Sequence, residues 1–501
     1  MLCPRPSAHR VGTDRAKCDE ERCDPLFLKG SAVSRLVIKF GGTSVGSADA
    51  ITQAARIATD LHRAGHEVVV VTSAMSGVTD LLLSAAQAAA GAQLGRFLEL
   101  ATAIRTKHTD AIASLFTDDH ERTSITSAID QRLGDLQRLA EALAVLGEAS
   151  PRAMDAIASL GERLSIHLLA GAIRAQGIGS APVDAADIVR TDAEFQSAVP
   201  DADETRRLSQ ARVVPMLTAG TVPVITGFVG STAAGVVTTL GRGGSDYSAA
   251  ILGAALDADE VWIYTDVDGV LTADPRVVTD ARTLEQVSYL EMSELAYFGA
   301  KVLHPKTTLP AIERGIPLRI KNTFNPGHPG TLVVATVEAP AGADQLQLRG
   351  VTSISRQSLV TIAGRGMLGV PGIAARAFGA VARTGTSVPM ISQSSSEQSI
   401  CFVVPESAEA RVLDELRKGF EHELVRRDIE RIFATPGVVV VTVVGAAILT
   451  TPGIAGRIFT AVGEGSINVL AIAMGSSECS ISLVVDGAHA QDAVRRIHGL
   501  I

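Results

Sequence analysis

Short apolar runs that alternate with long helical segments are the feature that most constrains the fold of this chain. Residues 67–71 read EVVVV, a continuous apolar run typical of a strand buried on both faces of a parallel sheet. Similar runs occur at residues 36–39, 222–228, 260–265 and 316–320. Residues 80–175 are mostly helical in pattern, with few glycine or proline breaks. This order predicts an α/β fold in which helices cover both faces of a mostly parallel sheet, in three layers.

Composition and charge exclude several classes of protein. The chain has 501 residues with 46% apolar and 20% charged side chains, as in a folded protein of roughly two to four domains. Its net charge is −9, so we expect no nucleic-acid partner. No apolar run approaches the ~20 residues of a membrane span, so we expect no membrane partner.

The N-terminal segment differs from the rest of the chain. Residues 1–34 are mixed in charge and contain three of the five cysteines, without the continuous apolar core of a secretory signal. We expect them to form a disordered extension or to result from an upstream start codon that is rarely used. Cys18 and Cys23 lack the further ligands of a zinc site, and the cysteines form no disulfide framework. The chain therefore fits a reducing compartment, which we expect to be the cytoplasm, and we expect no protein-bound metal site.

A lysine and two glycines follow the first predicted strand. Lys39 ends this strand, and Gly41 and Gly42 form the turn behind it. Glycine has no Cβ, so these N–H groups can approach an anion closely, and the lysine ammonium can reach the same anion. Because the lysine precedes the glycines and no GxxxxGK[ST] sequence occurs, this is not a Walker A loop. An ordinary tight turn has the same residues, so the phosphate-binding interpretation depends on the rest of the chain.

The sequence TLGRGGSDYS provides a second glycine-rich turn. Arg242 precedes Gly243 and Gly244, and Ser245 can cap an Ala-rich helix that has Asp246 in its first turn. The N-terminus of such a helix presents N–H groups to an anion. Two turns of this kind, one with a lysine and one with an arginine, favour a polyanion clamp over two unrelated turns.

Other polar residues occupy positions suited to ligand binding. Thr265 and Asp266 end a predicted strand at the TDVDG loop, and Arg276 follows in the sequence DPR. Lys301 lies in FGAKVLHP, and Glu162 lies in GERLS, within an otherwise apolar helix. Each has an ordinary alternative: a tight loop capped by aspartate, a solvated helix lysine, or a salt bridge between the glutamate and the adjacent arginine or another neighbour.

Taken in order, these motifs resemble those of the aspartate kinases in the amino-acid kinase superfamily. The matching stretches, from Lys39 to about Lys321, are VIKFGGTSV, SAMSGVTDLL, GERLS, GFVG, TLGRGGSDYSA, YTDVDGV, DPR and FGAKVLHP. The resemblance implies transfer of the ATP γ-phosphoryl group to the β-carboxylate of L-aspartate. This reaction is the first step of lysine, threonine and methionine biosynthesis. The acceptor carboxylate, with a pKa of ~3.9, is already ionised at neutral pH, so no general base is required.

The resemblance also implies roles for individual residues. The catalytic residues would be Lys39, Arg242 and Asp246. The substrate-binding residues would be Thr79, Glu162, Arg242 and Ser245, with the arginine on the α-carboxylate and the glutamate on the ammonium group. The ATP-binding residues would be Lys39, Gly41, Gly42, Gly243, Gly244, Thr265, Asp266, Arg276 and Lys301. Mg²⁺ would bridge phosphate oxygens and water, with few protein ligands.

The C-terminal part contains an internal repeat. Pro371 in the first copy corresponds to Pro452 in the second, and Glu397 corresponds to Glu478, both at an offset of 81 (452 − 371 and 478 − 397). Each copy has the order strand, helix, strand, strand, helix, which resembles the α+β ACT domains that bind amino acids. A small module used only for dimerisation is the alternative. The expected organisation is an extension at 1–34, a catalytic domain at 35–335, a linker at 336–355 and ACT domains at 356–435 and 436–501.

The repeat also suggests an effector. The sequences ISQSSSE and GSSE in the two copies resemble those of threonine-sensitive aspartate kinases, which are often fused to homoserine dehydrogenase. We expect no dehydrogenase part here. Ser392 and Gln393 in the first copy and Met474 in the second are the expected effector-binding residues. Related chains usually have glutamine where Met474 stands, and a thioether cannot replace an amide that donates and accepts. Threonine or lysine is the expected effector, and a homodimer or larger homo-oligomer is expected through the ACT domains.

Two alternatives to an active aspartate kinase stay open from the sequence. One is a catalytically silent amino-acid sensor, and the other is a kinase for a different amino acid. The four residues that separate an enzyme from a silent relative are present: Lys39, Glu162, Arg242 and Asp246. The sequence therefore favours the enzyme.

Overall fold

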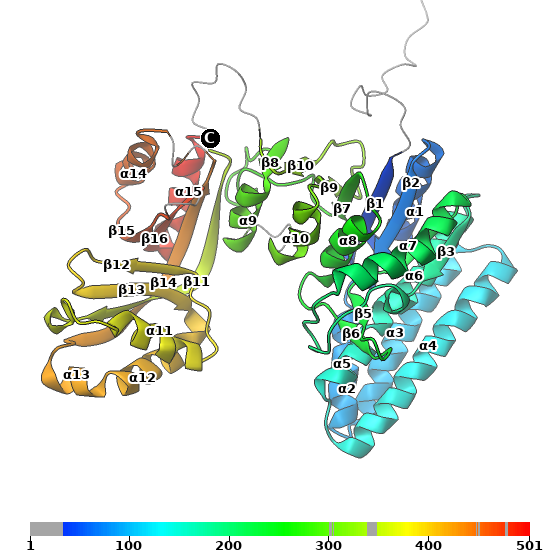
Figure 1. The fold of residues 1–501 in the computed structure, drawn as a ribbon, viewed down its shortest axis with the longest axis horizontal. Coiled ribbons are helices and arrows are strands. Elements are labelled where there is room, and N and C mark those ends of the chain that lie inside the picture. Colours follow the sequence, from blue (N-terminus) through cyan, green and yellow to red (C-terminus); the bar gives the residue numbers. More distant parts are fainter. Residues whose placement is uncertain are drawn as a thin grey trace, which may run out of the picture. The chain divides into compact units, whose positions relative to one another are not determined.

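An eight-stranded sheet forms the centre of the N-terminal part (Figure 1). The computed structural model describes residues 34–299, 303, 305–337, 348–446, 448, 451–475 and 479–501. Across the sheet the strands are β3 (Ser180–Val183), β4 (Val222–Thr226), β2 (Glu67–Thr72), β1 (Arg35–Phe40), β7 (Glu260–Thr265), β9 (Leu318–Asn322), β10 (Thr331–Val334) and β8 (Gln286–Ser288). Neighbouring strands are parallel except β9 and β10. The predicted, mostly parallel sheet is confirmed.

Alternate residues of the central strands pack into two hydrophobic cores, one on each face of the sheet. Leu36 and Ile38 of β1 belong to one core, whereas Val37 belongs to the other. In β2, Val68 belongs to the first core and Val69 to the second. Successive side chains of a strand point to opposite faces, so a continuous apolar run is what a sheet covered on both sides requires.

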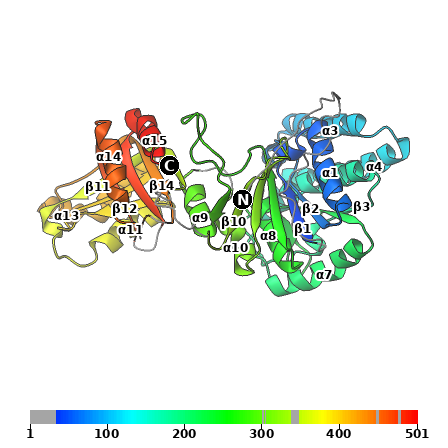
Figure 2. The same cartoon turned by 90° about the horizontal axis from the view of Figure 1, so that it is seen from above.

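Helices cover both faces (Figure 2). The helices of the first core are α1 (Ala48–Arg63), α2 (Val78–Ala90), α3 (Leu94–Leu115), α4 (Asp119–Leu146), α5 (Pro151–Ala158) and α6 (Leu160–Arg174). The opposite face is covered by α7 (Ala202–Thr218), α8 (Gly244–Ala255) and α10 (Pro305–Glu313), with α9 (Tyr289–Tyr297) beyond them. A short antiparallel hairpin, β5 (Val229–Ser231) and β6 (Val237–Thr239), leads from β4 to α8. The predicted three-layer αβα architecture is confirmed.

One helical stretch, Pro151–Arg174, is long and apolar enough to cross a membrane. It contains α5 and α6, and 83% of its most apolar window is buried inside this fold. Burial of this kind is typical of the core helix of a globular domain. This helix pair carries Glu162, so a rigid and buried element supports the candidate site.

The C-terminal part contains the two predicted repeats around one antiparallel sheet of strand order β12-β13-β11-β14-β16-β15. The first repeat comprises β11 (Gly350–Ala363), α11 (Ile373–Arg383), β12 (Met390–Gln393), β13 (Ser399–Pro405) and α12 (Glu409–Gly419), followed by a short α13 (Glu421–Arg426). The second comprises β14 (Arg431–Val444), α14 (Ile454–Glu464), β15 (Val469–Ala473), β16 (Ser480–Asp486) and α15 (Ala490–His498). The order strand, helix, strand, strand, helix occurs twice, as predicted.

The two repeats share their longest strands, which the sequence does not reveal. β11 and β14 each have 14 residues and pair with each other along most of their length. The first residues of β11 pair with the end of β14, beside β16, whereas residues 357–363 also pair with β13. The expected boundary at residues 435 and 436 therefore lies inside β14, and the expected domain limits stay a prediction.

Several earlier expectations fall on residues outside the described ones. These are the extension at 1–34 apart from Ser34, residues 338–347 of the linker, Lys301 and Glu478.

The last helix of the chain packs on a segment of the N-terminal part that follows the TDVDG loop. Residues 34–501 form one unit by their internal contacts. His498 Nε2 lies 2.9 Å from Thr272 Oγ1, and the Arg495 guanidinium donates to the Val277 carbonyl over 3.0 Å. Val278 is buried in the same hydrophobic core as α14 and α15. The second repeat thus contacts residues 272–278, which follow the predicted nucleotide-binding loop in the sequence.

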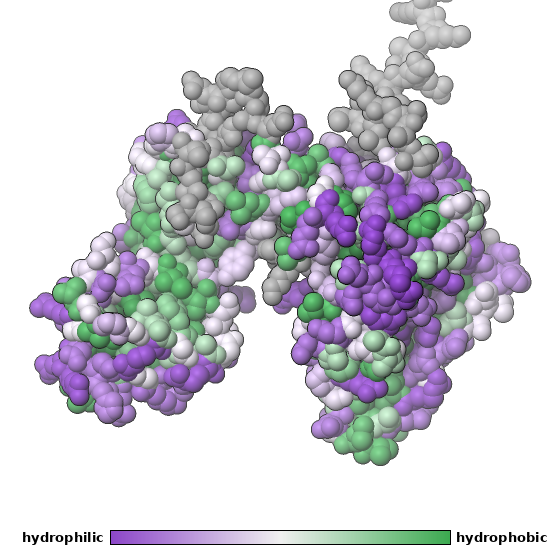
Figure 3. Space-filling model, viewed as in Figure 1, coloured by the Kyte–Doolittle hydropathy of each residue, from purple (hydrophilic) through white to green (hydrophobic). Residues whose placement is uncertain are grey.

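The hydropathy of the surface seen in Figure 3 differs between the N-terminal and C-terminal parts of the chain. Hydrophilic residues gather over α7, whose Glu204 and Arg207 form an exposed ion pair. Hydrophobic residues lie over β12 and β13 of the C-terminal sheet. The edge strand β12 carries Ile391, which is 49% exposed; at the other edge strand, β15, which lies beside β12 in space, Ile472 and the adjacent Met474 are 42% and 49% exposed. Exposed apolar edges of this kind are suited to pairing with another chain.

Candidate active site

A cavity of about 600 Å³ opens at the carboxyl ends of β1, β2 and β7, where parallel sheets place their ligand sites. Most of the predicted site residues line it: Lys39, Gly41, Gly42, Thr79, Glu162, Arg242, Gly243, Gly244, Ser245, Asp246 and Thr265. These residues come from five different segments of the chain. The fold therefore assembles the two glycine-rich turns and the GERLS glutamate in one place, as the motifs predicted.

Lys39 and Asp246 form the central ion pair of the cavity. Lys39 Nζ lies 2.5 Å from Asp246 Oδ1. The lysine is the next-to-last residue of β1 and is only 8% exposed, and the aspartate lies in the first turn of α8. A carboxylate near a helix N-terminus is stabilised by the helix dipole, and here it also neutralises a largely buried ammonium group. The pair places a cation and the N–H groups of α8 on the same side of the cavity.

One N–H group of the first glycine turn already has a hydrogen-bond partner within the protein. The Gly41 N–H donates to the carbonyl of Tyr264 over 3.3 Å. A Cβ on Gly42 would lie 3.3 Å from the carbonyl oxygen of Ala74, so a larger residue here would press on the neighbouring backbone. The expected use of the Gly41 amide for phosphate therefore requires that its bond to Tyr264 be shared or broken, a detail the motif does not reveal.

Glu162 is a buried carboxylate that faces the cavity. It lies in the first turn of α6 and is 4% exposed, and one of its oxygens accepts the Ala74 N–H over 3.1 Å. Its other oxygen, Oε2, has no partner among the described residues. Burial raises the pKa of Glu162 to about 8, against the smaller opposing effects of the Ala74 N–H and Lys39. A cationic group of a ligand would therefore favour the ionised form of this carboxyl group and provide a hydrogen-bond partner for Oε2.

The alternative interpretation of Glu162 was a salt bridge with the adjacent arginine, and the structure contradicts it. Arg163 Nε instead lies 2.7 Å from Asp184 Oδ2, at the end of β3. Residues i and i+1 of a helix point in different directions, so the arginine and the glutamate cannot face the same partner. Arg163 therefore links α6 to the end of β3, and Glu162 remains available to a ligand in the cavity.

Arg242 lies on an exposed turn between β6 and α8. Gly241 and Gly243 on either side have φ angles of 77° and 71°, a left-handed conformation that glycine adopts without strain. A Cβ on Gly227 would lie 2.7 Å from Cβ of Ser245, so the GFVG motif provides room for this turn. The glycines therefore let the backbone present an arginine and the N-terminus of α8 to the same space.

The nucleotide side of the predicted site is only partly assembled. Thr265 lines the cavity and donates to Asp266 Oδ1 over 3.1 Å, but Asp266 does not line it. Arg276 is 81% exposed and pairs with Asp274 at 2.6 Å, away from the cavity wall. Lys301 lies outside the described residues. The roles of these residues in ATP binding therefore remain predictions.

The loop that follows β2 completes the site, although its residues were not among the predicted site residues. Residues 73–77 line the cavity next to Thr79 and provide the Ala74 N–H for Glu162. Lys107 of α3 holds this loop by donating to the carbonyl of Ser76 over 2.7 Å. The loop acts through backbone groups, so only its small residues in the sequence SAMSG indicate that a ligand comes close.

The expected effector residues meet in a second cavity, of about 630 Å³. Ser392, Gln393 and Met474 line it together with Glu294 and Phe298 at the end of α9. Gln393 also lines a smaller cavity of about 320 Å³ beside the N-terminus of α11, which begins after a left-handed Gly372. The prediction that both repeats contribute to a common region agrees with this geometry, whereas the nature of the ligand stays a prediction.

Comparisons with known proteins agree with this organisation. Residues 34–322 match the amino acid kinase family, and residues 360–420 and 441–500 match an ACT domain family. The chain is 35% identical over 474 residues to the bifunctional aspartokinase/homoserine dehydrogenase 2 of Arabidopsis thaliana, covering 92% of this chain and 50% of the relative. It is 34% identical over 470 residues to the lysine-sensitive aspartokinase 3 of Escherichia coli, covering 92% and 98%. The chain thus spans about half the length of the bifunctional relatives it matches.

Solved structures show the same relationship. A crystal structure of E. coli aspartokinase III with lysine and aspartate superposes with a TM-score of 0.76 and 32% identity, covering 93% of this chain and 98% of that one. The same enzyme with aspartate and ADP gives a TM-score of 0.75 at 32% identity, covering 93% and 99%.

Proposed function

The chain belongs to the amino acid kinase family and, within it, to the aspartokinases, and from this we propose that it transfers the γ-phosphoryl group of ATP to the β-carboxylate of L-aspartate. The observation that carries the proposal is the buried, unpaired oxygen of Glu162 in the same cavity as Lys39 and Arg242. The product would be 4-phospho-L-aspartate. The E. coli relatives were solved with aspartate and with ADP, which supports both substrates.

At the amino-acid end, opposite charges fit the substrate. Glu162 would accept hydrogen bonds from the α-ammonium group, and Arg242 would bind the α-carboxylate through its two parallel donors. An ammonium group that enters the cavity would restore the charge of Glu162, whose pKa burial raises to about 8. Thr79 and Ser245, which also line the cavity, would hydrogen-bond the reacting β-carboxylate.

At the phosphoryl end, the chain supplies positive charge and backbone donors. Lys39, the Gly42 turn and the N-terminus of α8 would stabilise the charge on the oxygens of the transferring group. The β-carboxylate attacks the γ-phosphorus, the bond from phosphorus to the β,γ-bridging oxygen breaks, and ADP leaves with that electron pair. Asp246 would keep the Lys39 ammonium oriented in the meantime. Positioning and charge neutralisation supply the catalysis.

Mg²⁺ fits this site as part of the nucleotide. No group of three or more histidine, cysteine, aspartate or glutamate side chains with metal-binding geometry occurs among the described residues. Mg²⁺ takes up octahedral coordination and keeps several waters, so ATP oxygens and water can provide most of its ligands. The ion would reduce repulsion between the phosphates and the attacking carboxylate.

We further infer that the ACT pair regulates the enzyme. The cavity lined by Gln393 and Met474 borders α9 of the kinase part, so an amino acid bound there would contact both parts. Lysine is bound to the E. coli relative in one solved structure, and threonine is the other candidate. The exposed apolar edges at β12 and β15 support a homodimer. For this chain we propose a cytoplasmic location, although several plant relatives are chloroplastic.

An ADP-release assay with MgATP tests the proposal. L-Aspartate should support turnover, and hydroxylamine should trap the acyl phosphate that forms. L-Asparagine is the matched control because it keeps the ammonium and α-carboxylate groups but lacks the acceptor carboxylate. Turnover with L-glutamate or another amino acid instead of aspartate would indicate a different kinase. Amino-acid binding without any turnover would indicate a silent sensor.

A further inference from the structure

Asp155 of α5 is a fully buried carboxylate with three hydrogen bonds, and none of the site motifs contains it. It is 1% exposed. Its Oδ1 accepts the hydroxyl of Thr239 over 2.7 Å, and its Oδ2 accepts the Thr239 N–H over 2.9 Å. Oδ2 also accepts the N–H of Gln196 over 2.9 Å. A buried charge is retained only where hydrogen bonds compensate for the lost hydration, and here all three bonds come from two segments far away in the sequence.

The Thr239 bonds fix the start of the Arg242 turn. Thr239 is the last residue of β6, and Arg242 follows three residues later. The carbonyl of Thr239 accepts the Ala198 N–H over 3.0 Å, so the turn also rests on the segment that contains Gln196. A Cβ on Gly241 would lie 2.9 Å from the Gln196 carbonyl oxygen, which shows how closely the two backbones approach. Asp155 therefore holds the turn and its support at the same point.

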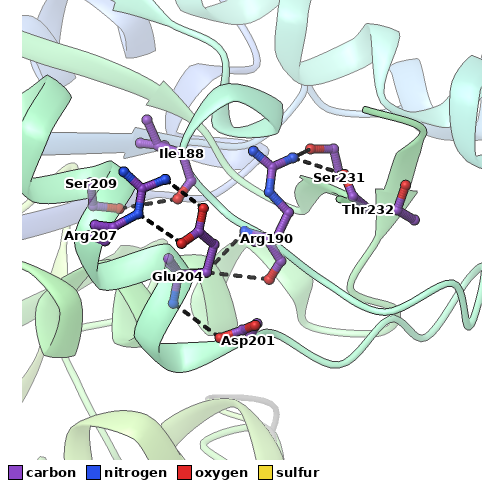
Figure 4. Close-up of polar contacts among 9 residues, drawn as sticks. Ile188, Arg190, Asp201, Glu204, Arg207, Ser209, Ser231 and Thr232 are labelled. Carbon is purple, nitrogen blue, oxygen red and sulfur yellow. Dashed lines mark hydrogen bonds and ion pairs between the residues drawn. The ribbon is translucent and has the colours of Figure 1, made fainter. Parts of the chain in front are cut away.

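The supporting segment is strained where Asp155 binds it. Gln196 has a φ angle of 70°, which is unusual for a residue other than glycine. The two ends of this segment, residues 190 and 201, are anchored separately: Arg190 donates to Ser231 Oγ and to the Thr232 carbonyl, and Asp201 caps α7 (Figure 4). With both ends of the segment fixed on β5 and α7, the bonds from Gln196 to Asp155 and from Ala198 to Thr239 hold its middle against β6.

Asp155 and Glu162 lie seven residues apart on the α5–α6 stretch. Seven residues are about two helical turns, which places both carboxylates on the same face, about 10 Å apart along the axis. One of them holds the Arg242 turn, and the other faces the cavity as the proposed ammonium site. The stretch that carries them consists of α5 and α6, which meet at Ser159; it starts with a Ser150 cap and Pro151, and its most apolar window is 83% buried. The spacing between the two subsites is thus built into one rigid element.

We propose that Asp155 is a positioning residue that sets the distance between Arg242 and Glu162 and thereby the preference for aspartate over its longer homologue. This inference rests on the proposed function. The α-carboxylate and the α-ammonium group are fixed by these two side chains. The place of the reacting carboxylate then depends on the number of methylene groups, and a displaced turn would lose that selection.

Asp155→Asn keeps the shape but replaces one acceptor by a donor, so at least one of the three N–H or O–H groups loses its partner. We expect the KM for aspartate to rise roughly tenfold and the KM for ATP to change less than about twofold. The ratio of kcat/KM for aspartate to that for glutamate should fall by about an order of magnitude. Amide hydrogen exchange at residues 239–245 should become faster in the ligand-free variant.

Two threonine variants make the test specific. Thr239→Val removes only the hydroxyl bond to Asp155, and it should change the KM for aspartate, the aspartate-to-glutamate ratio and the hydrogen exchange in the same direction. If Asp155→Asn does not fold, Thr239→Val serves as the test variant. Thr205 is the matched control because it is equally buried, and its hydroxyl accepts the Arg190 N–H at the other end of the supporting segment. Thr205→Val should lower the melting temperature without a selective change in the KM for aspartate.

Equal effects of Thr205→Val and Thr239→Val on the KM for aspartate would overturn the proposal, since a general loss of stability would then explain both. Unchanged exchange at residues 239–245 and an unchanged KM in Asp155→Asn would do the same. If wild-type protein does not phosphorylate aspartate, the proposed function fails. The exchange measurement in the absence of ligand still decides whether Asp155 holds the turn.

Discussion

The ammonium group of Lys39 lies 2.5 Å from the carboxylate of Asp246, so the end of β1 is tied to the first turn of α8. The two residues are separated by more than 200 positions in the sequence, yet they form one charged unit inside the cavity. Removal of either partner leaves the other charge largely buried and unpaired, which costs stability as well as activity. Variants of this pair therefore need a stability measurement beside the kinetic one.

Lys39→Ala should reduce kcat by about 10² or more, because it removes the charge that we place on the transferring phosphoryl group. Steady-state kinetics with aspartate and MgATP measures the change, and thermal unfolding reports the separate loss of stability. Asp246→Asn is the control for the ion pair because it keeps the lysine. A Lys39→Ala enzyme with nearly wild-type turnover would contradict the assignment.

Arg242→Ala should raise the KM for aspartate about tenfold or more and leave the KM for ATP nearly unchanged. A guanidinium binds a carboxylate through two parallel hydrogen bonds, which lysine cannot reproduce, so Arg242→Lys should recover only part of the affinity. Arg242 lies on an exposed turn, and the fold should tolerate both changes. A larger effect on ATP than on aspartate would assign this arginine to the nucleotide.

The pKa of Glu162 predicts how stability and binding depend on pH. Burial raises this pKa to about 8 from an ordinary value of 4.5, so the folded protein holds this proton more tightly than the unfolded chain. Its contribution to stability is complete below about pH 4.5 and is lost as the pH rises towards 8. Glu162→Gln should remove this part of the pH dependence of the melting temperature in ligand-free protein.

The same group should control substrate binding. The ionised carboxylate binds an ammonium group, so kcat/KM for aspartate should increase as the pH rises towards 8, while the KM for ATP should depend less on pH. A kcat/KM profile that is flat between pH 6 and 8 would show that Glu162 is already ionised in the free enzyme.

Regulation can be tested at Gln393 and Met474, which line the same cavity. An effector hydroxyl without a hydrogen-bond partner loses roughly 1–3 kcal/mol, or one to two decades of affinity. If threonine inhibits, it should do so mainly through Gln393, and Met474→Gln should strengthen the inhibition. Titrations with threonine and with lysine compare wild type, Gln393→Ala and Met474→Gln. Threonine inhibition that is unaffected by both substitutions would exclude these positions from effector recognition.

The sequence predicts the fold well where one physical rule dominates. The EVVVV run requires a strand covered on both faces, and Val68 and Val69 indeed pack into different cores. The glycine turns and the GERLS glutamate are local motifs with a chemical meaning, and they meet in one cavity.

Contacts between distant residues escape this kind of prediction. Nothing near Arg163 indicates that Asp184 is its partner, and Asp155 is a single carboxylate in a helix without a motif. The bond from the Gly41 amide to Tyr264 depends on how β1 and β7 pair, which a turn sequence does not contain. Such features follow from the packing of whole elements.

The strands β11 and β14 restrict how the regulatory half could be exchanged between enzymes. Each strand has one end among the partners of the first repeat and the other end among those of the second. A chimera joined between residues 364 and 430 would combine two strands that have not evolved to pair, over as many as 14 residues. A recombination point before Gly350 would transfer the whole sheet intact, so both repeats are expected to be inherited and engineered as a single cassette.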